Sequence, residues 1–332
     1  MAKKYDIYGI GNALVDIEVE VENSWLSENK IEKGVMTLVE EDKQKSLMEA
    51  ALNIKKKMQC GGSAANTIIG ASQFGANCYY SCKVANDEEG KFYMEDLKSN
   101  GVETNLTTDS LPEGITGKCL VMVTPDAERT LNTFLGITSN YSSNEINELS
   151  LRDSNYLYIE GYLITSESGR EAMKKAKKMA EENNVKVALT FSDPSMVKYF
   201  RDEMEEVVGA SVDMLFCNEE EACLFTGRDS LEEAREKLKK SAKRFAITLG
   251  SNGAMIYDGD TFIDIEPYQV KAVDSNGAGD MFAGAFLYGI TNGHTYASSG
   301  KLASLASSKI VSQFGPRLEW HQAKEVLNSA FR

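Results

Sequence analysis

The stretch that decides the fold covers residues 156–192 and reads YLYIEGYLITSESGREAMKKAKKMAEENNVKVALTFS. Its two ends, 156–161 and 185–192, are short apolar runs that predict strands, whereas 169–184 places its Met and Ala residues on one helical face. A strand, a helix and a second strand in succession are typical of parallel strands joined by a crossover helix. The stretch therefore predicts a mainly parallel sheet with helices on both faces, which is a three-layer αβα arrangement.

The same alternation extends outward over most of the chain. Ligands of such a sheet bind in the loops at the carboxyl ends of the strands, so we expect the functional site there. A long apolar helix after Gly277 and two further helices complete the chain. We also predict strands at 4–12, 214–218 and 245–250 and a strand pair at 253–267. Helices are predicted at 40–56 and 63–74. A further helix is predicted to begin at Ser230, because Glu233 follows three residues later in a capping-box pattern.

Two segments do not fit the alternation and predict a smaller sheet. Residues 13–40 and 113–136 are rich in strand-forming residues and suggest short exposed strands rather than helices. We interpret them as a small β-sheet lid that projects from the body. The predicted division is therefore a large α/β domain of 1–12, 41–112 and 137–332, and a lid of 13–40 and 113–136.

Composition and charge exclude several classes of protein. The 332 residues carry a formal net charge of −14, which disfavours nucleic acid and anionic membranes as partners and leaves a small molecule as the expected one. No apolar stretch is long enough to span a membrane, and the N-terminus lacks a signal-peptide pattern, so we expect a cytoplasmic protein. Six scattered cysteines and two histidines, with no CxxC pair, predict reduced thiols and no zinc site.

The most informative motif for chemistry is VDSNGAGDMFAG at 273–284. Gly277, Ala278 and Gly279 open an apolar helix, and the free N–H groups of a first helical turn, approached without Cβ interference, form an anion hole suited to phosphate. Asp280 lies in the same turn, where a carboxylate can take a proton from an attacking hydroxyl group. The motif therefore predicts phosphoryl transfer with Asp280 as the general base.

These residues resemble a known family. The run DSNGAGDMFAGAFLYG from residue 274 looks like the C-terminal signature of the ribokinase-like (PfkB) carbohydrate kinases, and CGGSAANT at 60–67 resembles their N-terminal Gly-Gly motif. Within the family, 11–17 (GNALVDI) and 116–136 look most like adenosine kinases and related bacterial nucleoside kinases. Ser275 and Ala13 depart from the Thr and Pro common in adenosine kinases, so the acceptor stays open.

The resemblance implies roles for residues on the acceptor side. A carboxylate accepts hydrogen bonds from two vicinal hydroxyl groups, so Asp16, assisted by Asn12, is expected to bind a sugar diol. Gly61 and Gly62 would let the backbone approach the substrate, and Asn66 could hydrogen-bond a sugar hydroxyl. The candidates for an apolar base pocket are Leu14, Leu135 and Tyr162.

The resemblance also implies ATP and Mg²⁺, with a monovalent cation such as K⁺ left open. Arg129 occupies the position of a lid arginine that closes over the phosphates in adenosine kinases. Glu221 is expected to organise Mg²⁺ through water. The expected ATP-binding residues are Asn218, Thr248, Gly250 and Gly253.

Other nucleotide-binding patterns are missing. Gly9 and Gly11 begin a dinucleotide fingerprint, but its third glycine is replaced by Leu14, and neither a P-loop nor a protein-kinase motif occurs. We therefore expect an ATP-dependent kinase acting on the 5′-hydroxyl of a purine nucleoside, adenosine first. A sugar kinase of the same family and a non-catalytic nucleoside-binding protein are the alternatives. The protein is expected to be a monomer or a lid-mediated homodimer.

Overall fold

The computed structural model describes residues 3–126 and 128–331, so positions 1, 2, 127 and 332 of the predicted domain ranges lie outside it. The larger sheet is parallel except at one edge, where the predicted pair at 253–267 is antiparallel. Within the described residues its order is β14 (Phe262–Ile265), β13 (Ala254–Tyr257), β12 (Phe245–Thr248), β11 (Met214–Asn218), β10 (Lys186–Thr190), β9 (Ser154–Glu160), β1 (Tyr5–Ile10), β5 (Cys78–Ser81) and β6 (Val102–Thr104).

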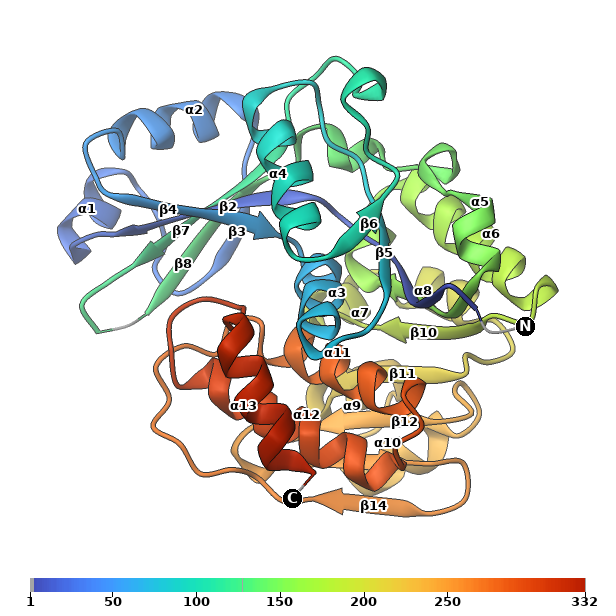
Figure 1. The fold of residues 1–332 in the computed structure, drawn as a ribbon. Coiled ribbons are helices and arrows are strands. Elements are labelled where there is room, and N and C mark those ends of the chain that lie inside the picture. The colour runs from blue at the N-terminus through green and yellow to red at the C-terminus, as the bar shows by residue number, and fades with distance from the viewer. Residues whose placement is uncertain (1–2, 127, 332) are drawn as a thin grey trace.

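Helices cover both faces of this sheet, which confirms the three-layer prediction (Figure 1). Along β11, Met214 and Phe216 join one buried apolar cluster while Leu215 and Cys217 join the other, as expected for a strand buried on both faces. The first face carries α3 (Ser63–Phe74), α4 (Glu88–Ser99), α11 (Ala278–Thr291), α12 (Tyr296–Val311) and α13 (Trp320–Ala330). The second carries α5 (Glu148–Arg152), α6 (Glu167–Glu182), α7 (Pro194–Tyr199), α8 (Arg201–Val208), α9 (Glu219–Thr226) and α10 (Leu231–Leu238).

The smaller sheet projects from the body as the lid (Figure 1). The predicted lid ranges, 13–40 and 113–136, contain four of its strands, whereas the fifth, β4, lies outside them. β4 was missed because its KKMQCG sequence shows no alternation of apolar residues; its pairing with β2 places it. The strand order is β3 (Met36–Leu38), β8 (Arg129–Phe134), β7 (Gly117–Val123), β2 (Leu14–Glu20) and β4 (Lys56–Gly61).

Two helical segments differ from the prediction. Residues 13–40 were expected to hold strands only, but α1 (Asn23–Glu28) is a helix that buries Leu26. Such a short helix leaves too few turns for a periodic pattern, so tertiary packing rather than sequence periodicity determines it. The helix expected at 40–56 ends early as α2 (Glu41–Ala50), ahead of β4.

The remaining elements are short or agree with expectation. The helix at 63–74 and the strand at 214–218 have the predicted bounds. Ser230 caps α10 by accepting a hydrogen bond from Glu233 N. No helix of the described chain has both the length and the apolar character needed to cross a bilayer. Single 3₁₀ turns occur at Thr108–Ser110, Gly136–Asn140, Ser143–Glu145, Gly161–Thr165 and Gly250–Asn252.

Candidate active site

A cavity of about 400 Å³ lies where the carboxyl ends of the parallel strands meet the lid sheet. That volume falls in the usual range for small-molecule sites. The position agrees with the expectation for a parallel sheet, because the loops after β1, β9, β10 and β11 all contribute to its wall. The residues predicted from the sequence that line it are Asn12, Leu14, Asp16, Gly62, Asn66, Leu135, Tyr162, Asn218, Glu221, Thr248, Gly277, Gly279 and Asp280.

Asp280 lies in the first turn of α11, behind the predicted glycine turn. Gly277 has φ of 75°, and a Cβ there would meet Pro316 Cβ at 2.4 Å, so this position requires glycine for conformation and for packing. A Cβ built on Gly279 meets nothing within 4 Å, so its face of the turn is open. Ala278 joins the two glycines without lining the cavity. The turn therefore leaves room for an anion beside Asp280.

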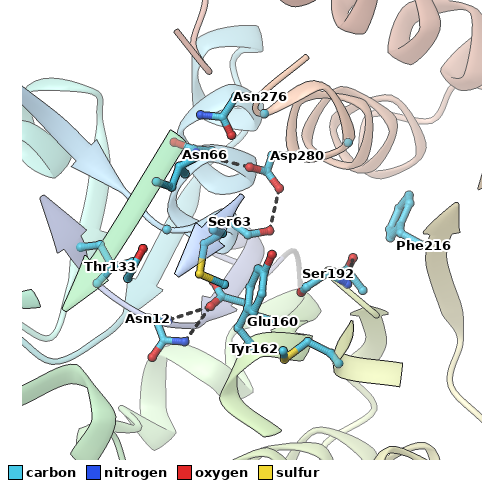
Figure 2. A pocket seen from close by; sticks show the side chains of 18 of the residues that line it. Asn12, Ser63, Asn66, Thr133, Glu160, Tyr162, Ser192, Phe216, Asn276 and Asp280 are labelled. Carbon is cyan, nitrogen blue, oxygen red and sulfur yellow. Dashed lines mark hydrogen bonds between the residues drawn. The ribbon is translucent and has the colours of Figure 1, made fainter. Parts of the chain in front are cut away.

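Two side chains from α3 hold the Asp280 carboxylate. Ser63 Oγ donates to Oδ1 at 2.6 Å and Asn66 Nδ2 donates to Oδ2 at 3.1 Å (Figure 2). Burial raises the pKa of Asp280 to about 6, against the opposing effect of these hydrogen bonds and of the Arg317 charge. The group is therefore mostly ionised at neutral pH and is more basic than an exposed aspartate.

Glu160 is a buried carboxylate that the sequence analysis did not single out. Its Oε1 accepts hydrogen bonds from the backbone N and Nδ2 of Asn12 at 3.2 and 3.0 Å, and its Oε2 accepts one from Ala64 N at 2.7 Å. Burial raises the pKa of Glu160 to about 7, while these hydrogen bonds oppose the shift. An acidic residue at the carboxyl end of the buried strand YLYIE was the available signal.

The Gly61-Gly62 pair is pressed against the predicted acceptor residues. A Cβ on Gly61 would lie 2.0 Å from Asp16 Oδ1, and one on Gly62, whose φ is 98°, would lie 2.3 Å from Asn12 O. Any side chain here would displace Asp16 or Asn12. The structure thus brings Asn12, Asp16 and Gly62 to the same wall of the cavity, with Gly61 behind Asp16.

Arg129 lies apart from the cavity wall, in an ion-pair cluster. Its Nη2 is 3.0 Å from Glu18 Oε2 and 2.6 Å from Asp274 Oδ2, and its side chain is 9% exposed. Asp274 belongs to the loop before α11 and also accepts hydrogen bonds from Asn276 N and Gly315 N. Arg129 therefore joins the lid to the loop that carries the glycine turn.

The predicted nucleotide-side residues divide into two groups. Asn218 and Glu221 form a reciprocal capping box at the start of α9, with Glu221 Oε2 accepting from Asn218 N at 2.9 Å. This cap needs no metal, and the described residues contain no cluster of three His, Cys, Asp or Glu side chains suited to one. Thr248 lines the cavity, whereas Gly250 and Gly253 do not, and a Cβ on Gly253 would meet Ile265 O at 2.0 Å.

The lid supplies most of the apolar side chains of the cavity wall. Met36 and Leu38 on β3 are 43% and 55% exposed although they face the cavity. Tyr162, from the turn after β9, closes another part of the wall (Figure 2). The apolar lid residues that line the cavity are Leu14, Met36, Leu38, Leu131 and Leu135.

A three-layer body with a β lid, and an aspartate beside a glycine turn, define a kinase of ribokinase-like fold. The chain belongs to the pfkB family of carbohydrate kinases, which it matches over residues 35–323, and is therefore an ATP-dependent kinase of a sugar or nucleoside. It is 31% identical to the adenosine kinase of Sinorhizobium meliloti, with a TM-score of 0.87 over 97% of this chain and 99% of that one.

Two other similar proteins are kinases with different names. A 5-dehydro-2-deoxygluconokinase from Halalkalibacterium halodurans is 29% identical over 80% of this chain and 83% of its own. A putative ribokinase II from E. coli, in complex with ATP and Mg²⁺, shares the fold with a TM-score of 0.79 at 20% identity, over 99% and 100% of the two chains. Kinases of this family use ATP and Mg²⁺, and their acceptors are sugars or nucleosides.

Proposed function

We propose that the protein phosphorylates the 5′-hydroxyl of a purine nucleoside, adenosine first. The observation that carries the proposal is that one cavity combines two kinds of surface. Asn12, Asp16 and Asn66 supply hydrogen-bonding groups, and Met36, Leu38 and the other apolar lid side chains supply an apolar surface. A nucleoside has the matching pair of features, a polyol sugar and a flat, mostly apolar base, whereas a free sugar leaves the apolar wall without a partner.

The proposed chemistry is in-line transfer with Asp280 as the base. Asp16 and Asn12 hold the sugar diol, so that the 5′-hydroxyl is directed at the turn of α11. Asp280 takes the hydroxyl proton while the acceptor oxygen bonds to the γ-phosphorus of ATP and the bond to the β-phosphate bridging oxygen breaks, releasing ADP. The N–H groups of Gly277 and Gly279 stabilise the charge on the transferred group, since the Ala278 N–H already donates to Ser275 O.

The residues present fit a bound nucleotide and its Mg²⁺ ion. The space beside Gly279 admits a phosphate, and Thr248 and Asn218 line the adjoining wall. Mg²⁺ would neutralise phosphate charge, and Glu221, which lines the cavity, would hold the ion through water. Arg129 is paired with Asp274 and would have to leave it to contact a phosphate. We therefore propose that Arg129 contacts the phosphates when the lid is closed and is not part of the cavity wall.

A sugar kinase of the same family is the second candidate. The gluconokinase relative supports it, and so does Glu160, because a buried carboxylate at the cavity wall suits a hydroxyl-rich ligand. The two candidates differ in the use of the apolar lid residues: the base of a nucleoside contacts them, and a small sugar does not.

The test is ATP turnover with Mg²⁺ against adenosine, inosine, guanosine, cytidine, ribose, fructose, fructose 6-phosphate and 5-dehydro-2-deoxygluconate. We expect a purine nucleoside to give the highest kcat/KM. Asp280→Asn, which keeps the shape and removes the base, should lower kcat by about 10²–10⁴-fold. Turnover of sugars alone would replace the nucleoside by a sugar, and a fully active Asp280→Asn would remove Asp280 as the base.

The pH dependence gives an independent check of the base. Only the ionised carboxylate accepts a proton, so kcat/KM should rise with pH and reach half its maximum near the Asp280 pKa of about 6 in the free enzyme. Asp280→Asn should lose this acid limb in its residual activity. A wild-type kcat/KM that is flat between pH 5 and 8 would contradict the assignment.

A further inference from the structure

Arg317 is a buried cation that no motif of the sequence points to. It lies in the loop between α12 and α13, and its side chain is only 9% exposed. All three of its guanidinium nitrogens donate hydrogen bonds. Nε donates to Asn66 Oδ1 at 3.3 Å, Nη1 to Asp96 Oδ2 at 2.9 Å, and Nη2 to the backbone oxygen of Cys60. The planar fork of an arginine is suited to holding three acceptors in fixed directions.

Two of these contacts anchor the guanidinium to the end of β4. Asp96, from α4, accepts a hydrogen bond from Cys60 N at 2.8 Å while it pairs with Arg317. Both sides of the Cys60 residue, its N–H and its carbonyl oxygen, are therefore held by the Arg317–Asp96 pair. A guanidinium fixed in this way can direct its remaining Nε–H at only one neighbour, which is Asn66.

The third contact decides which way the Asn66 amide points. Arg317 donates to Oδ1, so Nδ2 is left to donate to Asp280 Oδ2. A flipped amide would put its NH₂ group against the guanidinium and its oxygen against the carboxylate, and both contacts would be repulsive. Only the observed orientation satisfies all three side chains.

We infer that Arg317 is a positioning residue of this kinase, which locks the Asn66 amide so that it holds the Asp280 carboxylate in its reactive orientation. The inference rests on the proposed role of Asp280 as the base. Arg317 does not line the cavity and needs no contact with either substrate. Its effect should therefore appear in kcat and reach the reacting group only through Asn66.

The charge of Arg317 acts on the same carboxylate. The positive guanidinium favours the ionised form of Asp280 and opposes the effect of burial on its pKa. Removal of the charge should therefore move the acid limb of the kcat/KM profile above pH 6. The other titratable groups that face this site are Asp16 on β2, and Tyr158, Glu160 and Tyr162 on and after β9.

A double-mutant cycle tests the inference. With ATP and the best acceptor of the wild-type enzyme, Arg317→Gln should lower kcat by about 10²-fold while the KM for ATP changes less than about threefold. Asn66→Ala should lower kcat by a similar factor. In the Asn66→Ala background, Arg317→Gln should cost less than about threefold more, because interacting residues are not additive. Asp96→Asn is the matched control, since one amide oxygen can still accept from both Cys60 N and Arg317 Nη1 and so keep the guanidinium anchored, and it should cost less than about fivefold.

Two kinetic results would overturn the inference, because Arg317 would then act as a structural brace. The first is additive losses of kcat from Arg317→Gln and Asn66→Ala. The second is a loss of kcat in Asp96→Asn as large as that in Arg317→Gln. An acid limb that stays in place in Arg317→Gln would also count against it. If Arg317→Gln fails to fold, Arg317→Lys, which keeps the charge near Asp96, enters the same cycle with the same expected non-additivity. A fully active Asp280→Asn variant would instead remove Asp280 as the base, on which the inference rests, and turnover of sugars alone in the acceptor panel would separately replace the proposed nucleoside.

Discussion

The two sides of the cavity use glycine for opposite reasons. On the acceptor side, a Cβ on Gly61 would collide with Asp16 Oδ1 at 2.0 Å, so glycine is there because the neighbouring carboxylate fills the space. On the phosphate side, a Cβ on Gly279 would meet no atom within 4 Å. The first glycine completes a packed wall, and the second keeps a space open.

This difference shows which side of the site is complete before substrates arrive. Asn66 and Asp280 already hydrogen-bond each other, and Asn12 already bonds Glu160. At Gly279 the phosphate side instead offers a helix start and an unfilled volume, which is what an incoming anion needs. Substitution of Gly61 should therefore affect folding as well as activity, whereas substitution of Gly279 should affect activity alone.

The largest expected effect comes from the open side. Gly279→Ala places a methyl group in the space assigned to phosphate, and kcat/KM for ATP should fall by about 10²-fold, similar to the loss of one oxyanion donor. Thermal stability should stay equal or rise, because alanine favours a helix over glycine by about 0.5–1 kcal/mol. Initial rates at saturating acceptor and a thermal melt measure both. Wild-type kinetics in this variant would show that phosphate binds elsewhere.

Gly61→Ala is the matched variant on the packed side. The added methyl group must displace Asp16 or the β4 backbone, and overpacking of this kind costs about 1–3 kcal/mol. We expect a lower melting temperature together with lower activity. If Gly61→Ala melted like the wild-type protein, the packed description of this wall would be wrong.

The next effect concerns Asp16, the proposed partner of the sugar diol. At pH 8, where the Asp16 carboxylate is mostly ionised, Asp16→Asn removes a charged acceptor, and hydrogen bonds to charged groups contribute about 1.5–3 kcal/mol, so kcat/KM for the acceptor should fall by about 10–100-fold. The KM for ATP should stay within about twofold, because Asp16 lies on the other side of the cavity. A larger change in ATP affinity than in acceptor affinity would contradict the assignment.

Asp16→Asn should change the stability of the folded protein in the opposite direction from its activity. Burial raises the pKa of Asp16 to about 7, against the opposing charges of Arg317 and Arg129. The folded protein thus binds a proton that the unfolded chain has lost, so this group costs stability as pH rises from about 4 through 7. Asp16→Asn should therefore be more stable than the wild-type protein at pH 8, and the difference should vanish near pH 4.

The smallest expected effect tests the lid wall. Leu38 is 55% exposed, so Leu38→Ser should leave the melting temperature almost unchanged, but it removes apolar contact worth about 1 kcal/mol from a bound base. The KM for a nucleoside should rise about fivefold and that for a free sugar should not. Leu52→Ser is the control, because Leu52 is 71% exposed and lies outside the cavity. Equal effects of both variants would show that the lid wall contacts no substrate.

Much of the body could be predicted from the sequence because its signals are local. Apolar runs of strand length alternate with one-sided helices, and the structure follows them closely at 63–74 and 214–218. α1 and β4 were missed because neither carries a periodic apolar pattern. Leu26 packs into the core and β4 pairs with β2, and both are tertiary effects.

The site was predictable where short motifs carry it and not where distant segments meet. The glycine turn before Asp280 and the pair at Gly61 stand out as local sequence. Glu160 is a single acidic residue after an ordinary strand, and Arg317 is one arginine in an unremarked loop. Nothing local distinguishes Arg317 from a surface arginine, because its partners come from β4, α3 and α4.

The contact between Arg317 and Asn66 joins residues 251 positions apart. At a synthesis rate of about 5–20 residues per second, roughly 13–50 s separate the appearance of the two residues. During that interval Asn66 has no arginine to orient it, and Asp280 arrives only near the end. The helices α11, α12 and α13, which cover one face of the sheet together with α3 and α4, also come last, so both the complete body and its activity wait for the final part of the chain.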